Sequence, residues 1–527
     1  MIRTRPVLTV LLTAVLVSAM GSVGAGAAES NMSPARSAPS LAPAGSTPAL
    51  IEAAVARGTI DRAAADRYLA TALYRPSRLP ATFRSTVPWR GTLPLLALQG
   101  RAEAAGTTVA RLAGVAPRAG RDQCGGYGRS LPRKRVTRHF VILFDPDAFG
   151  GRLTIRAYSR TLERSWNTEI VRFGWPAPPF GAGSGGQYHV RIEDLGTGLY
   201  GFVTTNGATA GLVGNNPRTP WADHDAYSSC MVLNADYRGF PSAPLRSLQS
   251  TAAHEFNHSI QFGEGALTGV GAPDLVFTEG ATTMIEDEVF DRANDNYNYL
   301  WPSLSPSMGA YPETFAVYSY WIVFRAMVER FGTGVAGGGE DVMQEFWELT
   351  SRETAGNLGA MELALQAEGS TLADAFHDAA IAIRFSSSCG GGYVSPYCLQ
   401  EGAGYVARAG SVGNHGAITV IGLSLSRAVR DDHAASFIAL PKIGSPYDIS
   451  LSNDDSGGEL HGSVVCDTGA ALVVNALSQV AGAGQQATLN AFDPAGCARV
   501  VLVITNEQQN GSNPTSSDAR VFTVSTI

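Results

Sequence analysis

The chain has 527 residues, of which 45% are hydrophobic and 16% charged, with 59 glycines and a net charge of −7. This composition excludes an intrinsically disordered protein and is typical of a folded, loop-rich chain with two or three domains. The negative balance provides no basic surface for nucleic acid, so we expect no nucleic-acid partner.

Residues 1–28 have the pattern of a secretory signal peptide. Arg3 and Arg5 precede the apolar run PVLTVLLTAVLVSAM, and small residues follow in AGAAES. The run is too short to cross a bilayer comfortably, and no second apolar stretch of spanning length follows. We therefore expect a secreted, extracellular monomer without stable membrane insertion. An uncleaved N-terminal anchor is the alternative.

Six cysteines in an exported chain indicate three disulfide bonds. Their spacing favours the pairs Cys389–Cys398 and Cys466–Cys497, which leaves Cys124–Cys230 as the remaining pair. This set is a preference among many pairings. A thiolate of Cys124 that blocks a metal site in a precursor is the alternative for the third pair.

Residues 29–135 predict a helical leader or pro-region. Two helical patterns, STPALIEAAVARG and TIDRAAADRYLATALY, run from Ser46 to Tyr74. Ser46 with Pro48 resembles a helix start, and Gly58 a helix end. A plain accessory helical region explains the pattern equally well.

Residues 136–386 combine strand and helix patterns. Strands are predicted in RHFVILFDP, YHVRIEDLG and YSSCMVLNADY, with a helical pattern between the first two. Helices are predicted over 242–262, 279–290, 314–331 and, in pieces, 339–384. Strands followed by helices predict an α+β domain.

The character of the chain changes after a disulfide loop at 387–400. Residues 401–527 contain short alternating runs such as AITVIGLSLS and ARVVLVITN, separated by Gly, Asn, Asp and Ser. Short strands at this spacing predict a C-terminal antiparallel β-sandwich.

The stretch STAAHEFNHSIQFGEG carries the strongest chemical signal. It places His254 and His258 four residues apart on the predicted helix, so both imidazoles can face one point. An apolar row on the same helix can pack into the domain: Leu248, Ala252, Phe256 and Ile260. Zinc prefers nitrogen ligands in a tetrahedral arrangement, so this pair predicts a zinc site. Glu255 lies beside the pair, where it can contact a bound water without being a ligand.

A third ligand is needed to complete such a site. In FTEGATTMIEDEVF, Thr278 is predicted to cap a helix that begins at Glu279. Glu279 is the predicted third ligand, and Gly280 is expected to let the two helices approach closely. Glu286 is the alternative ligand, or a residue that orients a histidine.

HEFNH followed by TEGATTMIEDE resembles the gluzincin metallopeptidases, in which HExxH is completed by a glutamate on a following helix. The EGA text is similar to the second motif of the gluzincin aminopeptidases. The wider run from FVILFDP to AVYSYWIVFRAMVERFG resembles secreted bacterial metalloproteases with a helical leader. The resemblance covers about residues 46–386 and not the tail.

This resemblance implies a zincin-like domain that binds one Zn²⁺ through His254, His258 and Glu279. Glu255 would be the general base, which takes a proton from the zinc-bound water and delivers it to the leaving amine. Thr283 stands where thermolysin-like members have an aspartate. No Gly-rich exopeptidase motif precedes the zinc helix, which favours an endopeptidase.

Two further groups of residues are weaker candidates. Tyr318 and Tyr320 follow the metal helices and could donate a hydrogen bond to the developing oxyanion, and Tyr318 is the preferred choice. Core packing is the alternative role for both tyrosines. The oxygen-rich stretches DRANDNYNYL and SNDDSGG could hold Ca²⁺, although ordinary turns explain both better.

Together these features predict a secreted zinc peptidase that acts on protein or peptide substrates. The alternative is an exported binding or surface-associated protein with a structural or inactive metal site, whose β-sandwich holds carbohydrate or another protein. A zinc hydrolase acting on a non-peptide bond is a third interpretation.

Overall fold

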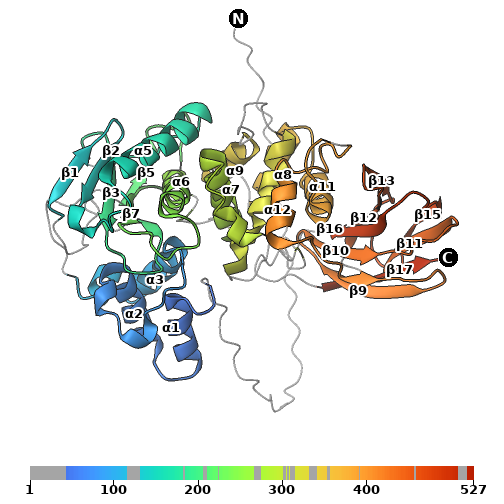
Figure 1. Ribbon diagram of the computed structural model, residues 1–527, viewed down its shortest axis with the longest axis horizontal. Helices are drawn as coiled ribbons and strands as arrows, with labels where there is room; N and C mark the ends of the chain where they lie inside the picture. The colour runs from blue at the N-terminus through green and yellow to red at the C-terminus, as the bar shows by residue number, and fades with distance from the viewer. Residues whose placement is uncertain are drawn as a thin grey trace, which may run out of the picture. The chain divides into compact units, whose positions relative to one another are not determined.

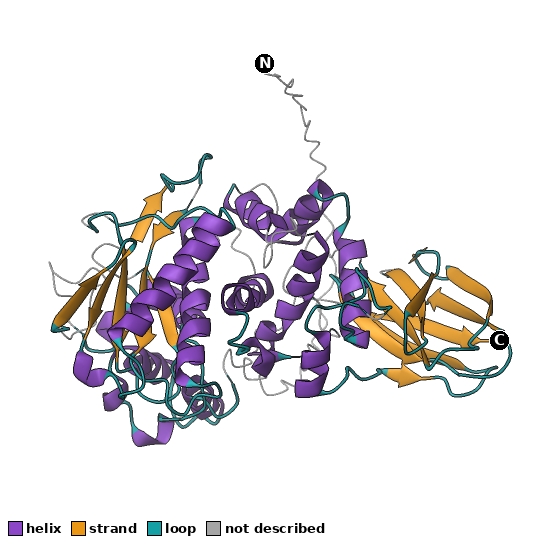
Figure 2. Cartoon of the chain, turned by 45° about the horizontal axis from the view of Figure 1, so that its top comes forward, coloured by secondary structure: helices purple, strands orange, loops and turns teal. Residues whose placement is uncertain are grey.

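The computed structural model describes residues 43–115, 131–181, 184–205, 211–223, 225–265, 267, 275–300, 304, 308, 315–331, 341–352, 357–390, 392–455, 458–507 and 519–527. Within these residues the chain is a mixed α+β protein with twelve α-helices and several β-sheets (Figure 1, Figure 2). None of the helices in these ranges is long and apolar enough to cross a membrane. The predicted signal peptide, and Cys124 with its predicted bond to Cys230, lie outside the described residues.

The N-terminal part is helical, as its sequence pattern predicts. It contains α1 (Thr47–Ala56), α2 (Arg62–Tyr74), α3 (Thr92–Ala104) and α4 (Val109–Leu112). Asp61 caps α2 because its side chain accepts a hydrogen bond from the backbone N–H of Ala64 over 2.6 Å. Apolar side chains of α2 and α3 form a core with one face of the sheet that follows.

A five-stranded sheet follows in the order β1-β2-β3-β7-β4. The strands are β1 (Arg133–Val136), β2 (Phe140–Phe144), β3 (Tyr188–Glu193), β4 (Gly201–Thr204) and β7 (Cys230–Asn234). β2, β3 and β7 are parallel, whereas the edge strands β1 and β4 are antiparallel to their neighbours. A separate hairpin is formed by β5 (Gly211–Gly214) and β6 (Ala226–Ser228).

Both faces of this sheet are buried. Met231 and Leu233 point into a core with α5 (Ile155–Trp166) and α6 (Pro244–Gly263), whereas Cys230 and Val232 point into the core of the N-terminal helices. This alternation follows from the two-residue period of a strand. The N-terminal helices therefore cover a sheet face that would otherwise expose apolar side chains.

A helical part follows α6; its first five helices lie close to the predicted ranges, whereas its sixth, Gly402–Ala409, falls within 401–527, where a β-sandwich was predicted. It contains α7 (Ala281–Phe290), α8 (Trp321–Phe331), α9 (Asp341–Ser351), α10 (Asn357–Ala367), α11 (Leu372–Phe385) and α12 (Gly402–Ala409). The 3-10 turns Asn296–Tyr299 and Phe315–Tyr320 precede α8.

The predicted start of the second metal helix is wrong. Thr278 does not cap a helix that begins at Glu279, because both residues lie inside a π-helical turn, Val276–Gly280, that leads into α7. The backbone is thus helical from Val276 onward, and the carbonyl oxygen of Thr278 accepts a hydrogen bond from the Thr282 hydroxyl over 2.6 Å.

The C-terminal part consists of two sheets around an apolar core. One sheet has the order β13-β12-β16-β10-β8, with β14 paired to β12, and the other has the order β15-β11-β17-β9. Neighbouring strands are antiparallel except β8 and β10. The strands are β8 (Gly416–Ala417), β9 (Ser424–Arg430), β10 (Ala434–Ala439), β11 (Tyr447–Asn453), β12 (Glu459–Asp467), β13 (Leu472–Ala476), β14 (Val480–Ala481), β15 (Gln486–Phe492), β16 (Arg499–Asn506) and β17 (Ala519–Thr526). The predicted disulfides Cys389–Cys398 and Cys466–Cys497 are both confirmed.

The larger of these two sheets is also buried on both faces. Ile438 and Val464 point into the core between the sheets, whereas Phe437 and Val465 belong to the core that includes α6, α7, α8 and α11. One continuous apolar core therefore joins the C-terminal strands to the helices. All described residues fall in one compact unit, Pro39–Ile527.

Candidate metal centre

Helix α6 carries the HEFNH stretch. The helix begins with Pro244 in its first turn, where a missing N–H is tolerated. The predicted helix start at Ser242 is two residues early, since Ala243 is at the N-cap, and the Ser242 hydroxyl donates to Asp295 over 2.6 Å. Phe256 packs in the aromatic cluster below the helix, where its ring centroid lies 5.6 Å from that of Trp166. The helix is thereby held by its apolar side.

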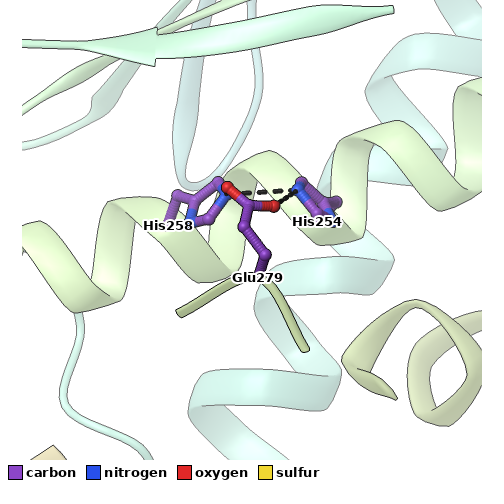
Figure 3. Close-up of side chains that lie close together, drawn as sticks. All are labelled: His254, His258 and Glu279. Carbon is purple, nitrogen blue, oxygen red and sulfur yellow. Dashed lines mark hydrogen bonds and ion pairs between the residues drawn. The ribbon is translucent and has the colours of Figure 1, made fainter. Parts of the chain in front are cut away.

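The structure brings the three predicted ligands together (Figure 3). The Nε2 atoms of His254 and His258 are 3.1 Å apart. The Glu279 carboxylate extends toward both, with Oε2 3.1 Å from Nε2 of His254 and Oε1 3.2 Å from Nε2 of His258. All three side chains are fully buried. Such a group of donor atoms could hold a metal ion.

The proton on His258 is placed by Gln261, a residue that the sequence did not single out. Nδ1 of His258 lies 2.8 Å from Oε1 of Gln261. The amide nitrogen of Gln261 donates to Oδ1 of Asn257 over 3.1 Å and to the hydroxyl of Thr282 over 2.8 Å. These partners fix the amide orientation, so the oxygen of Gln261 accepts from Nδ1. The lone pair of Nε2 is thereby left facing Glu279.

His254 is oriented in the same way by a carboxylate. Its Nδ1 lies 2.9 Å from Oε1 of Glu286, which accepts the N–H. Glu286 is thus at the orienting position, one of the two roles predicted for it, and not among the three converging groups. Orienting carboxylates of this kind are common behind metal-bound histidines.

The orienting carboxylate is itself held by a residue from the N-terminal part. Nη2 of Arg90 lies 2.6 Å from the same Oε1 of Glu286 and 3.7 Å from Oδ2 of Asp295. Arg90 is buried, and its guanidinium stacks over the rings of Tyr200, Tyr299 and Tyr318 at 5.2–5.9 Å from their centroids. No local pattern in the sequence pointed to Arg90, because its partners are far away along the chain.

The side chains of His254, His258 and Glu279 shift one another's pKa values. Burial disfavours the ionised form of Glu279, yet the two imidazoles hold the pKa of this carboxyl well below its usual range. Burial also opposes protonation of His258, but Glu279 raises its pKa above the ordinary value. The pKa of His254 is lowered by burial and by Arg90. The cluster thus keeps a carboxylate that is ready to share a cation or a proton with two imidazoles.

Glu255 lies beside this cluster and is also fully buried. Its Oε2 accepts a hydrogen bond from the Thr92 hydroxyl over 2.7 Å. Its Oε1 has no hydrogen-bond partner within the described ranges. Burial, with a smaller contribution from Glu279, raises the pKa of Glu255 to about 7. A carboxyl with such a pKa can both accept and return a proton near neutral pH.

The two candidate tyrosines lie in different surroundings. The ring centroid of Tyr318 is 6.2 Å from that of His254, and burial keeps its pKa well above the ordinary value, so its hydroxyl stays protonated. Tyr320 instead packs against Gly280, where an added Cβ would lie 3.3 Å from its Cβ and 2.7 Å from the Phe324 ring. Gly280 therefore permits close approach of α8 and its preceding turn, whereas the prediction assigned this glycine to the contact between the two metal helices.

Thr283, which the resemblance aligned with the aspartate of thermolysin-like members, lies on α7. Its hydroxyl is buried and has no hydrogen-bond partner in the described part of the chain. The orienting role for His254 thus falls to Glu286, one turn further along α7.

A second group of His and Glu residues is less suited to a metal. Donor atoms of His377, His461 and Glu507 also lie within 4.8 Å of one another. However, the two imidazoles stack at 3.9 Å with planes only 9° apart, so their in-plane lone pairs run parallel and cannot meet at one ion. Both nitrogens of His377 already bond to hydroxyls, Thr505 at 2.8 Å and Ser463 at 2.9 Å. This group joins α11 to β12 and β16.

The stretches considered for Ca²⁺ form ordinary hydrogen bonds where the structure describes them. Asp295 accepts from Ser242, and Asp454 accepts from Ser452 over 2.8 Å. Neither stretch belongs to a convergent group of three His, Cys or acidic ligands among the described residues.

Comparisons with known proteins found no relative of this chain. No family model, no curated protein and no solved structure matches the chain.

Proposed function

We propose that the protein is a secreted zinc-dependent peptidase, with His254, His258 and Glu279 as ligands and Glu255 as general base. The observation that carries the proposal is the convergence of the donor atoms: the two Nε2 atoms lie 3.1 Å apart, and the Glu279 carboxylate places Oε2 3.1 Å from His254 and Oε1 3.2 Å from His258. Two ligands that bind one zinc ion tetrahedrally, each about 2.0–2.1 Å from it, lie about 3.3 Å apart. The spacing of the donor atoms is therefore close to the spacing that a zinc ion requires.

The chemistry of the donors favours zinc over harder cations. Two imidazole nitrogens and one carboxylate form a common ligand set of catalytic zinc, whereas Ca²⁺ and Mg²⁺ prefer oxygen ligands. Both imidazoles present Nε2 because Gln261 and Glu286 accept their Nδ1 protons. When bound, zinc would polarise a carbonyl group and lower the pKa of a coordinated water to about 7.

The remaining steps depend on side chains of this chain. Thr92 holds Oε2 of Glu255, so Oε1 can take the proton of the attacking water and later protonate the leaving amine. Tyr318, beside His254, is the candidate donor to the developing oxyanion. Two disulfides are compatible with an extracellular protein.

The proposal is tested with Glu255→Gln in the purified full chain. Zinc content is measured by mass spectrometry, and hydrolysis is followed with casein and with a library of short fluorogenic peptides. Short peptides are included because the four site residues are buried and substrate must displace what covers them. The variant should keep its zinc and lose activity about 10²–10⁴-fold.

Glu103→Gln is the matched control, since Glu103 is exposed on α3. It should leave both zinc content and hydrolysis unchanged. Unaltered turnover in Glu255→Gln would overturn the mechanism. A zinc-loaded wild-type protein that cleaves no substrate would favour the binding-protein alternative.

A further inference from the structure

Residues 89–91 extend the five-stranded sheet beyond its edge strand β4. The N–H of Trp89 donates to the carbonyl oxygen of Gly198 over 2.7 Å, and the N–H of Tyr200 donates to that of Trp89 over 3.0 Å. The N–H of Gly91 then donates to the carbonyl oxygen of Gly201 over 3.0 Å. This short parallel pairing fixes the backbone on both sides of Arg90.

Gly91 is required for this approach. A Cβ at this position would lie 2.9 Å from Cβ of Phe202 and 3.0 Å from the carbonyl oxygen of Gly201. Real side chains do not tolerate such contacts with backbone, so a larger residue would push the segment off the sheet. The glycine thus allows Arg90 and Thr92 to reach the metal centre from outside the sheet.

The two residues that flank Gly91 contact different parts of the centre. Arg90 binds Glu286, which accepts the Nδ1 proton of His254. Thr92 donates to Glu255 and accepts from the N–H of Val203 on β4 over 3.0 Å, so its hydroxyl direction is determined. The segment 89–92 therefore supports both the candidate ligand His254, through Glu286, and the candidate base Glu255.

We propose that Arg90 and Thr92 are positioning residues of the metal centre, and that the N-terminal part 43–115 stays on the active enzyme instead of being a removable pro-segment. This inference rests on the proposed zinc peptidase function. Loss of the N-terminal part would leave the buried carboxylates of Glu286 and Asp295 without Arg90, the arginine that pairs with them. It would also expose Phe202 and Val232, which are fully buried against the N-terminal helices.

Zinc affinity of the full chain tests the role of Arg90 without any peptidase assay. The dissociation constant is measured by competition with a chromophoric chelator. Arg90→Met should weaken zinc binding at least tenfold, as expected when support behind a ligand is lost. Arg101→Met is the matched control, because Arg101 pairs with Asp66 within the N-terminal part and does not contact the centre. It should change the affinity less than twofold.

A double-mutant cycle shows whether Arg90 acts through Glu286. Arg90→Met, Glu286→Gln and the double variant are compared by zinc affinity. Coupled residues give non-additive effects, so the double variant should be no weaker than the worse single variant. Independent effects that multiply, or an Arg90→Met protein with wild-type affinity, would overturn the inference. If Arg90→Met does not fold, Arg90→Lys is compared with Arg101→Lys. Zinc affinity should then fall several-fold in Arg90→Lys and stay unchanged in Arg101→Lys.

Thr92 is tested by its conservative variants. Thr92→Val should leave zinc affinity within twofold and lower kcat about tenfold with little change in KM, because Glu255 loses a hydrogen bond, as does the N–H of Val203, whereas the three ligands keep theirs. Thr92→Ser keeps the hydroxyl and should restore kcat. A Thr92→Val protein with wild-type kcat, or Ser and Val variants that are equally impaired, would overturn this role.

Mass spectrometry of the secreted, zinc-loaded protein tests retention of the segment. The inference expects an N-terminus before Arg90. A zinc-loaded form that begins after residue 115 would overturn it. A chain that binds zinc as described but cleaves nothing would refute the peptidase proposal alone, since every measurement on Arg90 depends only on zinc.

Discussion

Oε1 of Gln261 accepts the Nδ1 proton of His258 over 2.8 Å, three residues along the same helix. Because the amide nitrogen of Gln261 is engaged by Asn257 and Thr282, this amide cannot turn without losing two hydrogen bonds. Gln261 thereby determines which imidazole nitrogen faces Glu279. The helix that carries HEFNH thus also carries the residue that selects the ligating nitrogen of its second histidine.

Gln261→Leu should weaken zinc binding about tenfold, because the imidazole loses the acceptor that fixes its tautomer and ring orientation. Affinity is measured by chelator competition. Gln366→Leu is the control, since the side chain of Gln366 is exposed and bonds to Glu362 on the surface of α10. Equal affinities in both variants would show that His258 needs no such support.

Tyr318→Phe should lower kcat/KM about 10²-fold and leave zinc affinity unchanged. The expected cause is loss of a protonated hydroxyl near the reacting carbonyl, whose removal weakens stabilisation of the oxyanion. Tyr320→Phe is the comparison, because Tyr320 packs against Gly280 instead of His254. If the two variants are equally active, Tyr318 is a packing residue, which is the alternative that its sequence context left open.

Local patterns in the sequence predicted much of the fold. The helix that carries His254 and His258 is amphipathic over its whole length, and its bounds were predicted within two residues. The strand pattern beyond residue 401 and two of the disulfides were recognised for the same reason, since each depends on short-range spacing. The π-helical turn before Ala281 was missed, because Thr278 has the chemistry of a cap but lies within helical backbone that begins at Val276.

The supports of the candidate site could not be predicted in this way. Thr92 and Glu255 are separated by 163 residues, and Arg90 lies even farther from Glu286 along the chain. No periodicity connects such positions, so only the folded chain reveals them. Gln261 is the exception. It follows His258 by three residues on a predicted helix, a spacing that places both on one face.

The C-terminal strands and the helices should unfold together, because they share one apolar core. Val503 on β16 is fully buried against the helices, whereas Val521 on β17 is 41% exposed. Val503→Asp should destabilise the whole protein by about 4 kcal/mol, since it buries an unpaired charge, and Val521→Asp should cost less than about 1 kcal/mol. Urea unfolding monitored by fluorescence and circular dichroism measures both. Two separate transitions in the wild-type protein would show that the strands form an independent module.

Acid should destabilise the protein partly through His433. This residue is buried at the junction of α11 and β10, with its ring edge-on to Phe376 at 5.7 Å and its Nδ1 without a hydrogen-bond partner among the described residues. Burial lowers its pKa from 6.5 to about 4. As pH falls through this interval, the unfolded chain takes a proton that the folded chain does not, so the free energy of unfolding decreases. The full effect is about 3 kcal/mol.

His433→Asn isolates this contribution from the other titrating groups. The backbone φ of His433 is 67°, and Asn adopts this left-handed conformation more readily than most residues, so the substitution preserves the turn. The difference in free energy of unfolding between wild type and variant, measured in urea at pH 7 and at pH 4, should shift by about 3 kcal/mol in favour of the variant at the lower pH. A difference that stays constant with pH would mean that the folded chain accepts a proton at His433 as easily as the unfolded one. The imidazole would then have a partner or a path to solvent that its burial does not suggest.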